Sequence, residues 1–132
     1  MEKDFEVGQS NELVKDGRVY DLHNLYDFSG IHIGAQRCVR LSFSPNPEHG
    51  GGLRAVVIVF HRVDFLQVGG SLGATDITDL DEVGYKEPGD EDDSWLLDAV
   101  RRSPQAHLFF RLGADAFVRI HSARARLWEL ML

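Results

Sequence analysis

The fold of this chain is decided by the stretch Val56-Val57-Ile58-Val59-Phe60-His61-Arg62-Val63-Asp64-Phe65-Leu66-Gln67-Val68. Successive side chains of a strand point to opposite faces, and both faces of this stretch are apolar as far as Phe60. The pattern therefore predicts a central strand that is covered on both sides. Because the apolar pattern continues beyond Arg62, we expect a bend or bulge near His61-Arg62 that lets one long strand serve two sheets.

Shorter apolar–polar alternations on both sides of this stretch are typical of antiparallel strands. Val39, Leu41 and Phe43 share one face of such a run. Prolines and glycines over residues 45–52 predict a loop, and Gly113-Ala114-Asp115 predicts a tight hairpin. Further strands are expected at residues 18–22, 31–33, 36–44, 106–112, 116–121 and 124–131.

One helix is predicted, over residues of about 93–102. Asp92-Asp93-Ser94 supply capping acceptors before the apolar run that starts at Trp95, and Arg101 and Arg102 suit its C-terminal end. The fold class is therefore α+β and mainly β: an antiparallel sheet or sandwich of about 7–8 strands with this helix packed on it.

The size and composition of the chain predict one folded domain. It has 132 residues, of which 43% are hydrophobic, enough for a single core. Residues 1–16 are mostly polar and are expected to form a loosely ordered arm, with residues 17–132 forming a single β-rich domain. Cys38 is the only cysteine, which fits a reducing compartment, and we expect a cytoplasmic protein without membrane contact.

The net charge of −7 is concentrated in one acidic segment between residues 76 and 93, where Lys86 is the only base. Such a segment repels phosphate backbones and attracts basic proteins, so we expect a basic protein partner and no direct nucleic-acid binding. The alternative is a solvated loop that only aids solubility. The candidate partner-binding residues are Asp76, Asp79, Asp81, Glu82, Glu87, Asp90, Glu91, Asp92 and Asp93.

A second candidate surface lies on the C-terminal hairpin. Phe109, Arg111, Phe117 and Arg119 are expected on one face, where they form either a partner surface or a layer covered by the helix or by the acidic segment. If this face is free, the alternative function is a small-ligand-binding or homo-oligomeric structural module. A homodimer is one of the assemblies that the sequence allows.

Two fragments imitate hydrolase motifs. His49-Gly50-Gly51-Gly52 resembles an oxyanion loop, and Gly69-Gly70-Ser71-Leu72-Gly73 fits the nucleophile-elbow pattern. The elbow needs a strand-to-helix turn on a parallel sheet, but the residues after Ser71 have poor helical character. Six histidines show no close metal-ligand spacing, so neither a metal nor a cofactor is expected. The enzyme alternative, a small hydrolase or metal-dependent enzyme, requires His61 or His121 to meet Ser71 or an acid across strands.

The order of these features resembles the small β-rich immunity proteins of bacterial polymorphic toxin systems. The resemblance is carried by residues 26–33, by residues 39–43, by residues 57–65 and by the final strands from His107. It implies a non-enzymatic inhibitor, without catalytic residues, that binds a cognate toxin and blocks it. The acidic segment is then the expected blocking surface, presented to a basic toxin in the manner of a nucleic acid.

Overall fold

The computed structural model describes residues 1–70, 79–92, 94–113 and 115–130. Its main sheet has seven strands: six follow the order β5-β6-β7-β10-β9-β8 with antiparallel neighbours, and β1 pairs in parallel with β10. The mainly β fold class is thereby confirmed. The strands of this sheet are β1 (Glu2–Lys3), β5 (Tyr26–Ile33), β6 (Val39–Pro45), β7 (Val56–Gly69), β8 (Leu80–Lys86), β9 (His107–Leu112) and β10 (Phe117–Glu129).

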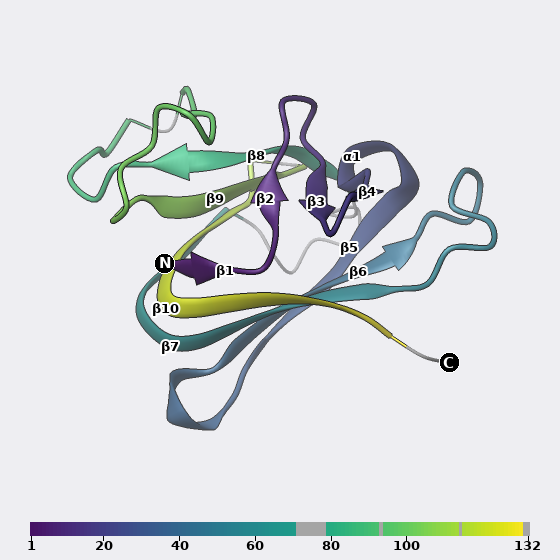
Figure 1. Cartoon of the computed structure of the whole chain (residues 1–132), viewed down its shortest axis with the longest axis horizontal. Coiled ribbons are helices and arrows are strands. Elements are labelled where there is room, and N and C mark those ends of the chain that lie inside the picture. The colour runs from purple at the N-terminus through teal and green to yellow at the C-terminus, as the bar shows by residue number, and fades with distance from the viewer. Residues whose placement is uncertain (71–78, 93, 114, 131–132) are drawn as a thin grey trace.

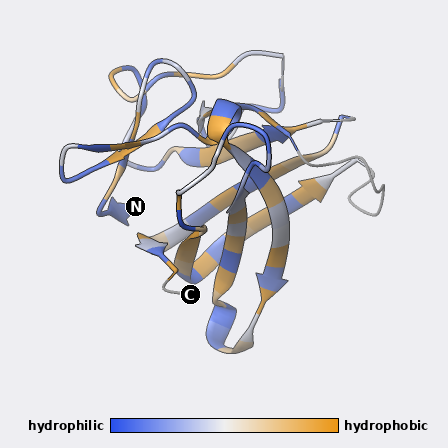
Figure 2. Cartoon of the chain, turned by 90° about the vertical axis from the view of Figure 1, so that its right-hand side faces the viewer, coloured by the Kyte–Doolittle hydropathy of each residue, from blue (hydrophilic) through white to orange (hydrophobic). Residues whose placement is uncertain are grey.

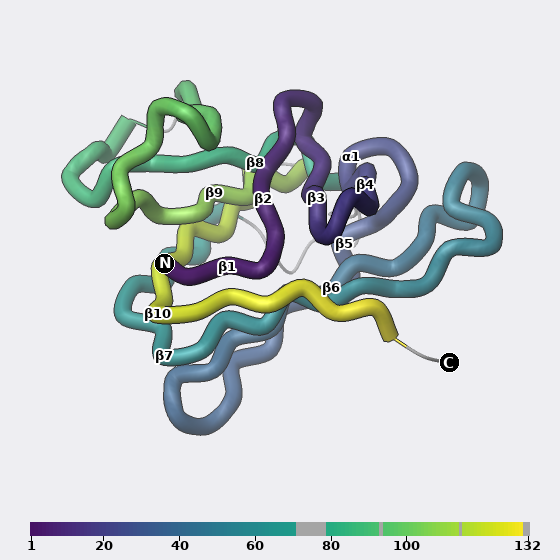
Figure 3. The backbone as a smooth tube through the Cα atoms, in the orientation of Figure 1, coloured from purple at the N-terminus to yellow at the C-terminus, as the bar shows by residue number. Residues whose placement is uncertain are grey.

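The two long strands β7 and β10 pair along their whole length and bend together, so that each serves both halves of the curled sheet (Figures 1 and 3). Their pairing register shifts between His121 and Ser122, opposite Asp64, which lies two residues after Arg62. Arg62 has a φ of 56° there, a left-handed conformation that turns the strand. The bend expected near His61-Arg62 is confirmed.

A second, three-stranded sheet is formed by β2 (Glu6–Val7), β3 (Leu13–Lys15) and β4 (Arg18–Tyr20). Its side chains Val7 and Leu13 are buried, as is Phe5, in the same core as the main sheet. The hydroxyl of Tyr20 donates to Glu129 Oε1 at 2.9 Å, which ties this sheet to the end of β10. The first 16 residues therefore belong to the packed core, although a loosely ordered arm was expected.

The apolar faces of the main-sheet strands meet in the interior, and apolar and polar residues alternate along the ribbons (Figure 2). In the part of the chain that the structure describes, the helical elements are α1 (Leu22–Leu25) and the 3-10 turn η1 (Ala35–Arg37). The carbonyl oxygen of Leu80 lies 2.6 Å from His23 Nδ1, so α1 closes the gap between β5 and β8.

The expected strands are present, with altered bounds. Residues 31–33 belong to the longer strand β5, and β6 begins at Val39 because Ala35–Arg37 form η1. The two C-terminal runs, 116–121 and 124–131, are one strand, β10, and its hairpin with β9 is confirmed. Part of the predicted acidic segment, Leu80–Lys86, forms a full strand, β8, which pairs with β9.

The helix predicted over residues 93–102 is wrong for the described residues 94–102, which form turns and one isolated β-bridge. Leu97 exchanges two backbone hydrogen bonds with Tyr85, at 2.9 and 3.0 Å. Asp98 Oδ1 accepts the N–H groups of Val100 and Arg101 at 3.1 and 3.0 Å. A short polar side chain that accepts from backbone N–H groups two or three residues onward competes with helix formation. Here the segment around Asp98 forms turns instead of a helix.

Candidate functional site

The predicted acidic segment is divided between a strand and a loop. Asp81 and Glu82 lie exposed on β8, whereas residues 87–92, which we call the acidic loop, begin the connection from β8 to β9. Asp79 is exposed just before β8. Asp76 and Asp93 lie outside the described residues. The structure thus brings Glu87, Asp90, Glu91 and Asp92 together and places the earlier acids along the strand.

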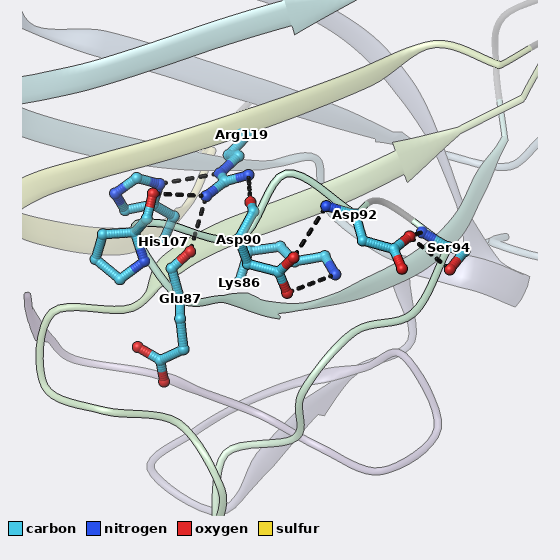
Figure 4. Close-up of polar contacts among 8 residues, drawn as sticks. Lys86, Glu87, Asp90, Asp92, Ser94, His107 and Arg119 are labelled. Carbon is cyan, nitrogen blue, oxygen red and sulfur yellow. Dashed lines mark hydrogen bonds and ion pairs between the residues drawn. The ribbon is translucent and has the colours of Figure 1, made fainter.

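The backbone of the acidic loop is fixed by one buried arginine of β10 (Figure 4). Arg119 is only 4% exposed, and its Nη1 donates to the carbonyl oxygen of Asp90 at 2.6 Å. Its Nη2 donates to the carbonyl oxygen of Glu87 at 2.9 Å. Because a planar guanidinium donates in fixed directions, these bonds set the path of the loop relative to the central sheet.

His107 of β9 accepts a hydrogen bond from Arg119 and so helps to fix its guanidinium. The Nε of Arg119 donates to His107 Nδ1 at 3.0 Å, so this nitrogen must be an unprotonated acceptor. The imidazole stacks on Phe65, with ring centroids 4.4 Å apart. Burial, followed by the nearby charge of Arg119, lowers the pKa of His107 to about 4. A neutral imidazole at physiological pH is therefore part of the support of the acidic loop.

Lys86 provides the second internal contact of the acidic loop. Its side chain is fully buried, and its Nζ lies 3.3 Å from Asp90 Oδ2 and 4.2 Å from the ring centroid of Trp95. A buried ammonium needs such compensation, which a carboxylate and an aromatic face supply here. Trp95 remains 48% exposed, so it covers Lys86 and also presents apolar surface beside the loop.

The loop carboxylates are held in their ionised form by hydrogen bonds. The hydroxyl of Ser103 lowers the pKa of Glu87, and the backbone N–H of Asp92 lowers that of Asp90. The hydroxyl of Ser94 donates to Asp92 and lowers its pKa. The loop therefore presents fixed negative charge, with Glu91 and Asp92 exposed.

The second candidate surface is covered. Phe109 is completely buried and stacks on Phe117 with centroids 5.1 Å apart, whereas Arg111 lies over Phe109 and pairs with Glu82 at 3.1 Å. At Arg119 the covering segment is the acidic loop, whose carbonyl oxygens at Glu87 and Asp90 accept from the guanidinium. The acidic segment, one of the two expected covers, therefore packs here, and only Arg111 and Phe117 stay partly exposed.

One histidine meets the requirement set for an enzyme in part. His121 Nδ1 lies 2.6 Å from Asp64 Oδ1. Burial is the largest single influence and opposes ionisation of Asp64, but the hydrogen bond with His121, the charge of His121 and a backbone hydrogen bond together lower the pKa of Asp64. A carboxylate that orients an imidazole is one part of a general base. Ser71 lies outside the described residues, and His61 is exposed elsewhere on β7.

The glycines of His49-Gly50-Gly51-Gly52 have a packing role at one position. A Cβ on Gly50 would lie 2.4 Å from the carbonyl oxygen of Leu25 and 2.6 Å from the backbone nitrogen of Asn46. The loop therefore approaches the start of β5 too closely for any side chain. Of Gly69-Gly70-Ser71-Leu72-Gly73, the last three residues lie outside the described ranges.

Sequence reasoning missed three residues of this site in their actual roles. Arg119 was expected either on a partner surface or under a covering layer, without a role as an anchor. Lys86 was noted only as the one base of the acidic segment, and Trp95 was placed at the start of the apolar run of a helix. One signal was available: Arg119 shares strand parity with Phe109 and Phe117, so an arginine was expected in an aromatic layer. Arg119 becomes an anchor only because the acidic loop packs on it and accepts its hydrogen bonds.

No three His, Cys, Asp or Glu side chains among the described residues are grouped so that they could hold a metal ion. Within the same residues, every helix is too short to cross a bilayer. Comparison of the chain with protein-family models, with curated protein sequences and with solved structures gives no match.

Proposed function

We propose that this protein is a non-enzymatic protein-binding domain, of the immunity-inhibitor type, that binds a basic partner protein through the acidic loop in the cytoplasm. The observation that supports it is the anchoring of the loop backbone by Arg119, which leaves Glu91 and Asp92 exposed on a fixed support. A loop already held in one conformation loses less entropy on binding than a mobile one.

The chemistry beside the loop suits a surface rich in lysine and arginine. Exposed carboxylates of fixed geometry steer a basic partner and accept charge-assisted hydrogen bonds. Trp95 adds a partly exposed aromatic ring next to them, and tryptophan is enriched among residues that dominate interface energies. The reducing compartment is proposed on the single cysteine, Cys38.

The test compares two charge-matched double variants in the source cells. Glu91→Gln/Asp92→Asn removes the exposed charge of the acidic loop, whereas Asp16→Asn/Glu48→Gln removes two exposed charges elsewhere. We expect crosslinking mass spectrometry to join one basic protein to residues near the loop in the wild type and the control, but not in the loop variant. The purified complex should weaken about tenfold or more between 50 and 200 mM salt.

Equal crosslinking of both double variants, or a partner attached away from residues 87–95, would overturn the assignment of the loop. A circular dichroism spectrum and a thermal melt of each variant separate loss of binding from loss of folding.

The Asp64–His121 pair favours a second candidate function, a small hydrolase. An oriented imidazole is a general base if a substrate reaches its second nitrogen. The test is a screen of ester and phosphodiester hydrolysis, with and without divalent metal, on the wild type and His121→Gln. Turnover that disappears in His121→Gln would support an enzyme, and equal background rates would exclude this pair.

A further inference from the structure

Three arginines stand apart from the other cations of this acidic protein. Lysines and arginines number 14 against 21 acidic residues. Within residues 1–70, 79–92, 94–113 and 115–130, the guanidinium groups of Arg37, Arg40 and Arg62 make no hydrogen bond or ion pair, and all three side chains are exposed. Unpaired arginines are unexpected where carboxylates are in excess.

Arg40 lies on one face of the sheet, and Arg37 and Arg62 adjoin that face because they line hollows together with His61. Arg40 of β6 is in register with Val59 of β7, which pairs on its other side with Arg126 of β10. In the adjoining row, Arg124 is in register with His61. We call this surface the basic face; it consists of Arg37, Arg40, His61, Arg62, Arg124 and Arg126.

Two hollows adjoin each other on the basic face. One is lined by Glu2, His61, Arg62, Ala123 and Arg124. The other is lined by Gln36, Arg37, Cys38, His61 and Arg62. His61 and Arg62 line both hollows, so the hollows adjoin at these two residues. Each hollow has one further arginine in its lining, Arg124 in the first and Arg37 in the second.

The backbone around the second hollow is strained. Gln36, Arg37 and Arg62 have φ values of 59°, 57° and 56°, in the left-handed region that non-glycine residues rarely adopt. Each such residue costs about 1 kcal/mol or more, and residues of this kind gather at binding sites because their strain re-aims side chains. Three of them surround one hollow here.

The basic face already holds one oxygen anion, the carboxylate of Glu2. Its Oε1 accepts a hydrogen bond from Arg126 Nη2 at 2.8 Å, and its Oε2 lies 3.8 Å from Arg124 Nε. The hydrogen bond from Arg126 lowers the pKa of Glu2. Glu2 leaves Arg37, Arg40 and Arg62 unneutralised.

We propose that the basic face binds a ligand that carries a chain of phosphate groups, with successive phosphates in the two hollows on either side of Arg62. Guanidinium groups bind phosphate oxygens in bidentate fashion, and two adjoining hollows favour an extended polyanion over a single ion. Polyphosphate and the backbone of a single-stranded nucleic acid share this chemistry.

The acidic loop does not prevent such binding. The η1 turn lies between β5 and β6 at the bottom of Figure 1, whereas the connection that contains the acidic loop lies at the top left. Charges separated by more than a Debye length, about 8 Å at physiological salt, are largely screened. The expectation of no nucleic-acid binding was based on the acidic segment, whose loop lies away from this face (Figure 1). The inference concerns another face and is independent of the proposed inhibitor function.

The test measures fluorescence anisotropy of a labelled single-stranded 12-nucleotide DNA at 50 mM salt, with sodium tripolyphosphate as a competitor. Arg37→Gln/Arg62→Gln changes both hollows. Arg18→Gln/Arg101→Gln is the matched control, since both arginines are exposed and pair with acids away from this face. We expect the hollow variant to weaken binding at least tenfold and the control less than threefold.

The competitor distinguishes the two sources of phosphate. Displacement of the DNA by tripolyphosphate supports a site for phosphate chains alone, whereas DNA binding that tripolyphosphate does not displace supports a nucleic-acid strand as the ligand. Equal weakening in the two variants, or no binding of either probe by the folded wild type, would overturn the proposal. So would sedimentation showing salt-sensitive self-association that the hollow variant abolishes without DNA binding, because the occupant would then be a second copy.

Discussion

At the scale of single residues, Arg119 links the central sheet to the acidic loop. Its guanidinium donates to the carbonyl oxygens of Glu87 and Asp90 and to the Nδ1 of His107. The carbonyl oxygen of Glu87 also accepts the backbone N–H of Asp90 at 3.0 Å. A buried charge of this kind is stable only while its hydrogen bonds persist. The path of the loop and the folding of β9 and β10 are therefore energetically coupled.

Arg119→Met should consequently lower the free energy of unfolding by about 2–4 kcal/mol, because it removes the guanidinium donor from the carbonyl oxygen of Asp90 and from His107 Nδ1. Arg101→Met is the control: that exposed arginine only pairs with Asp98, and its loss should cost about 0.5 kcal/mol or less. Urea unfolding measures both. Similar small losses in the two variants would show that the loop is not held by Arg119.

His107 makes stability depend on pH in a defined window. Its folded pKa of about 4 lies below the ordinary value of 6.5, so the unfolded chain takes up the proton first as the pH falls. This contribution to the free energy of unfolding is fully present above pH 6.5 and decreases between pH 6.5 and 4, by about 3 kcal/mol in total. Carboxylates with lowered pKa values change the free energy of unfolding only at lower pH. The slope of that free energy between pH 6.5 and 5 therefore reports the titration of His107.

The variant His107→Asn tests this dependence, since an amide oxygen can accept from Arg119 Nε but does not titrate. Chemical unfolding at pH 7.0, 6.0 and 5.0 should show a slope that is clearly smaller for the variant than for the wild type. Parallel curves for the two proteins would assign the slope to other groups.

At the scale of elements, the sequence was most informative where the apolar pattern of one strand indicates which of its faces are buried. The two apolar faces of residues 56–60 predicted β7, its central place and the bend at Arg62. The failed helix over residues 93–102 had good capping residues and apolar spacing, but Asp98 turns the chain and Leu97 pairs with Tyr85. Tertiary pairing overrode local propensity there.

The candidate site was predictable only in part for the same reason. The acidic residues and the aromatic-basic hairpin face were both visible in the sequence, but their packing on each other through Arg119 depends on contacts between distant parts of the chain. The basic face was hidden further, because Arg37, Arg62 and Arg124 are far apart in sequence and meet only when the sheet curls.

The loop between β6 and β7 supplies a matched pair of glycines. Gly50→Ala should lower the free energy of unfolding by about 2 kcal/mol or more, because its Cβ would lie 2.4 Å from backbone oxygen. Gly51→Ala has open space around it and should be neutral or slightly stabilising. Thermal unfolding distinguishes this packing role from a catalytic one, and equal melting temperatures would argue against it.

At the scale of the whole molecule, the N-terminal segment completes the core that the curled sheet leaves open. The strands β2 and β3 bring Val7 and Leu13 into the same buried cluster as Leu127 of β10. Lys15 Nζ also donates to the carbonyl oxygen of Leu127 at 2.7 Å and pairs with Asp4 at 3.0 Å. The segment therefore stabilises the long strand that also carries Arg119 and part of the basic face.

Phe5→Ala tests this dependence, because Phe5 belongs to the segment that was expected to be loosely ordered. Its side chain is 5% exposed, and removing a buried phenyl ring should cost about 3–4 kcal/mol. Val19→Ala, at a position 62% exposed on β4, should change the free energy of unfolding by about 0.5 kcal/mol or less. If both substitutions are neutral in urea unfolding, residues 1–16 are an arm after all. If only Phe5→Ala destabilises, the contacts of Arg119 should be lost at the same lowered urea concentration as the rest of the fold, because β10 joins the two regions in one cooperative unit.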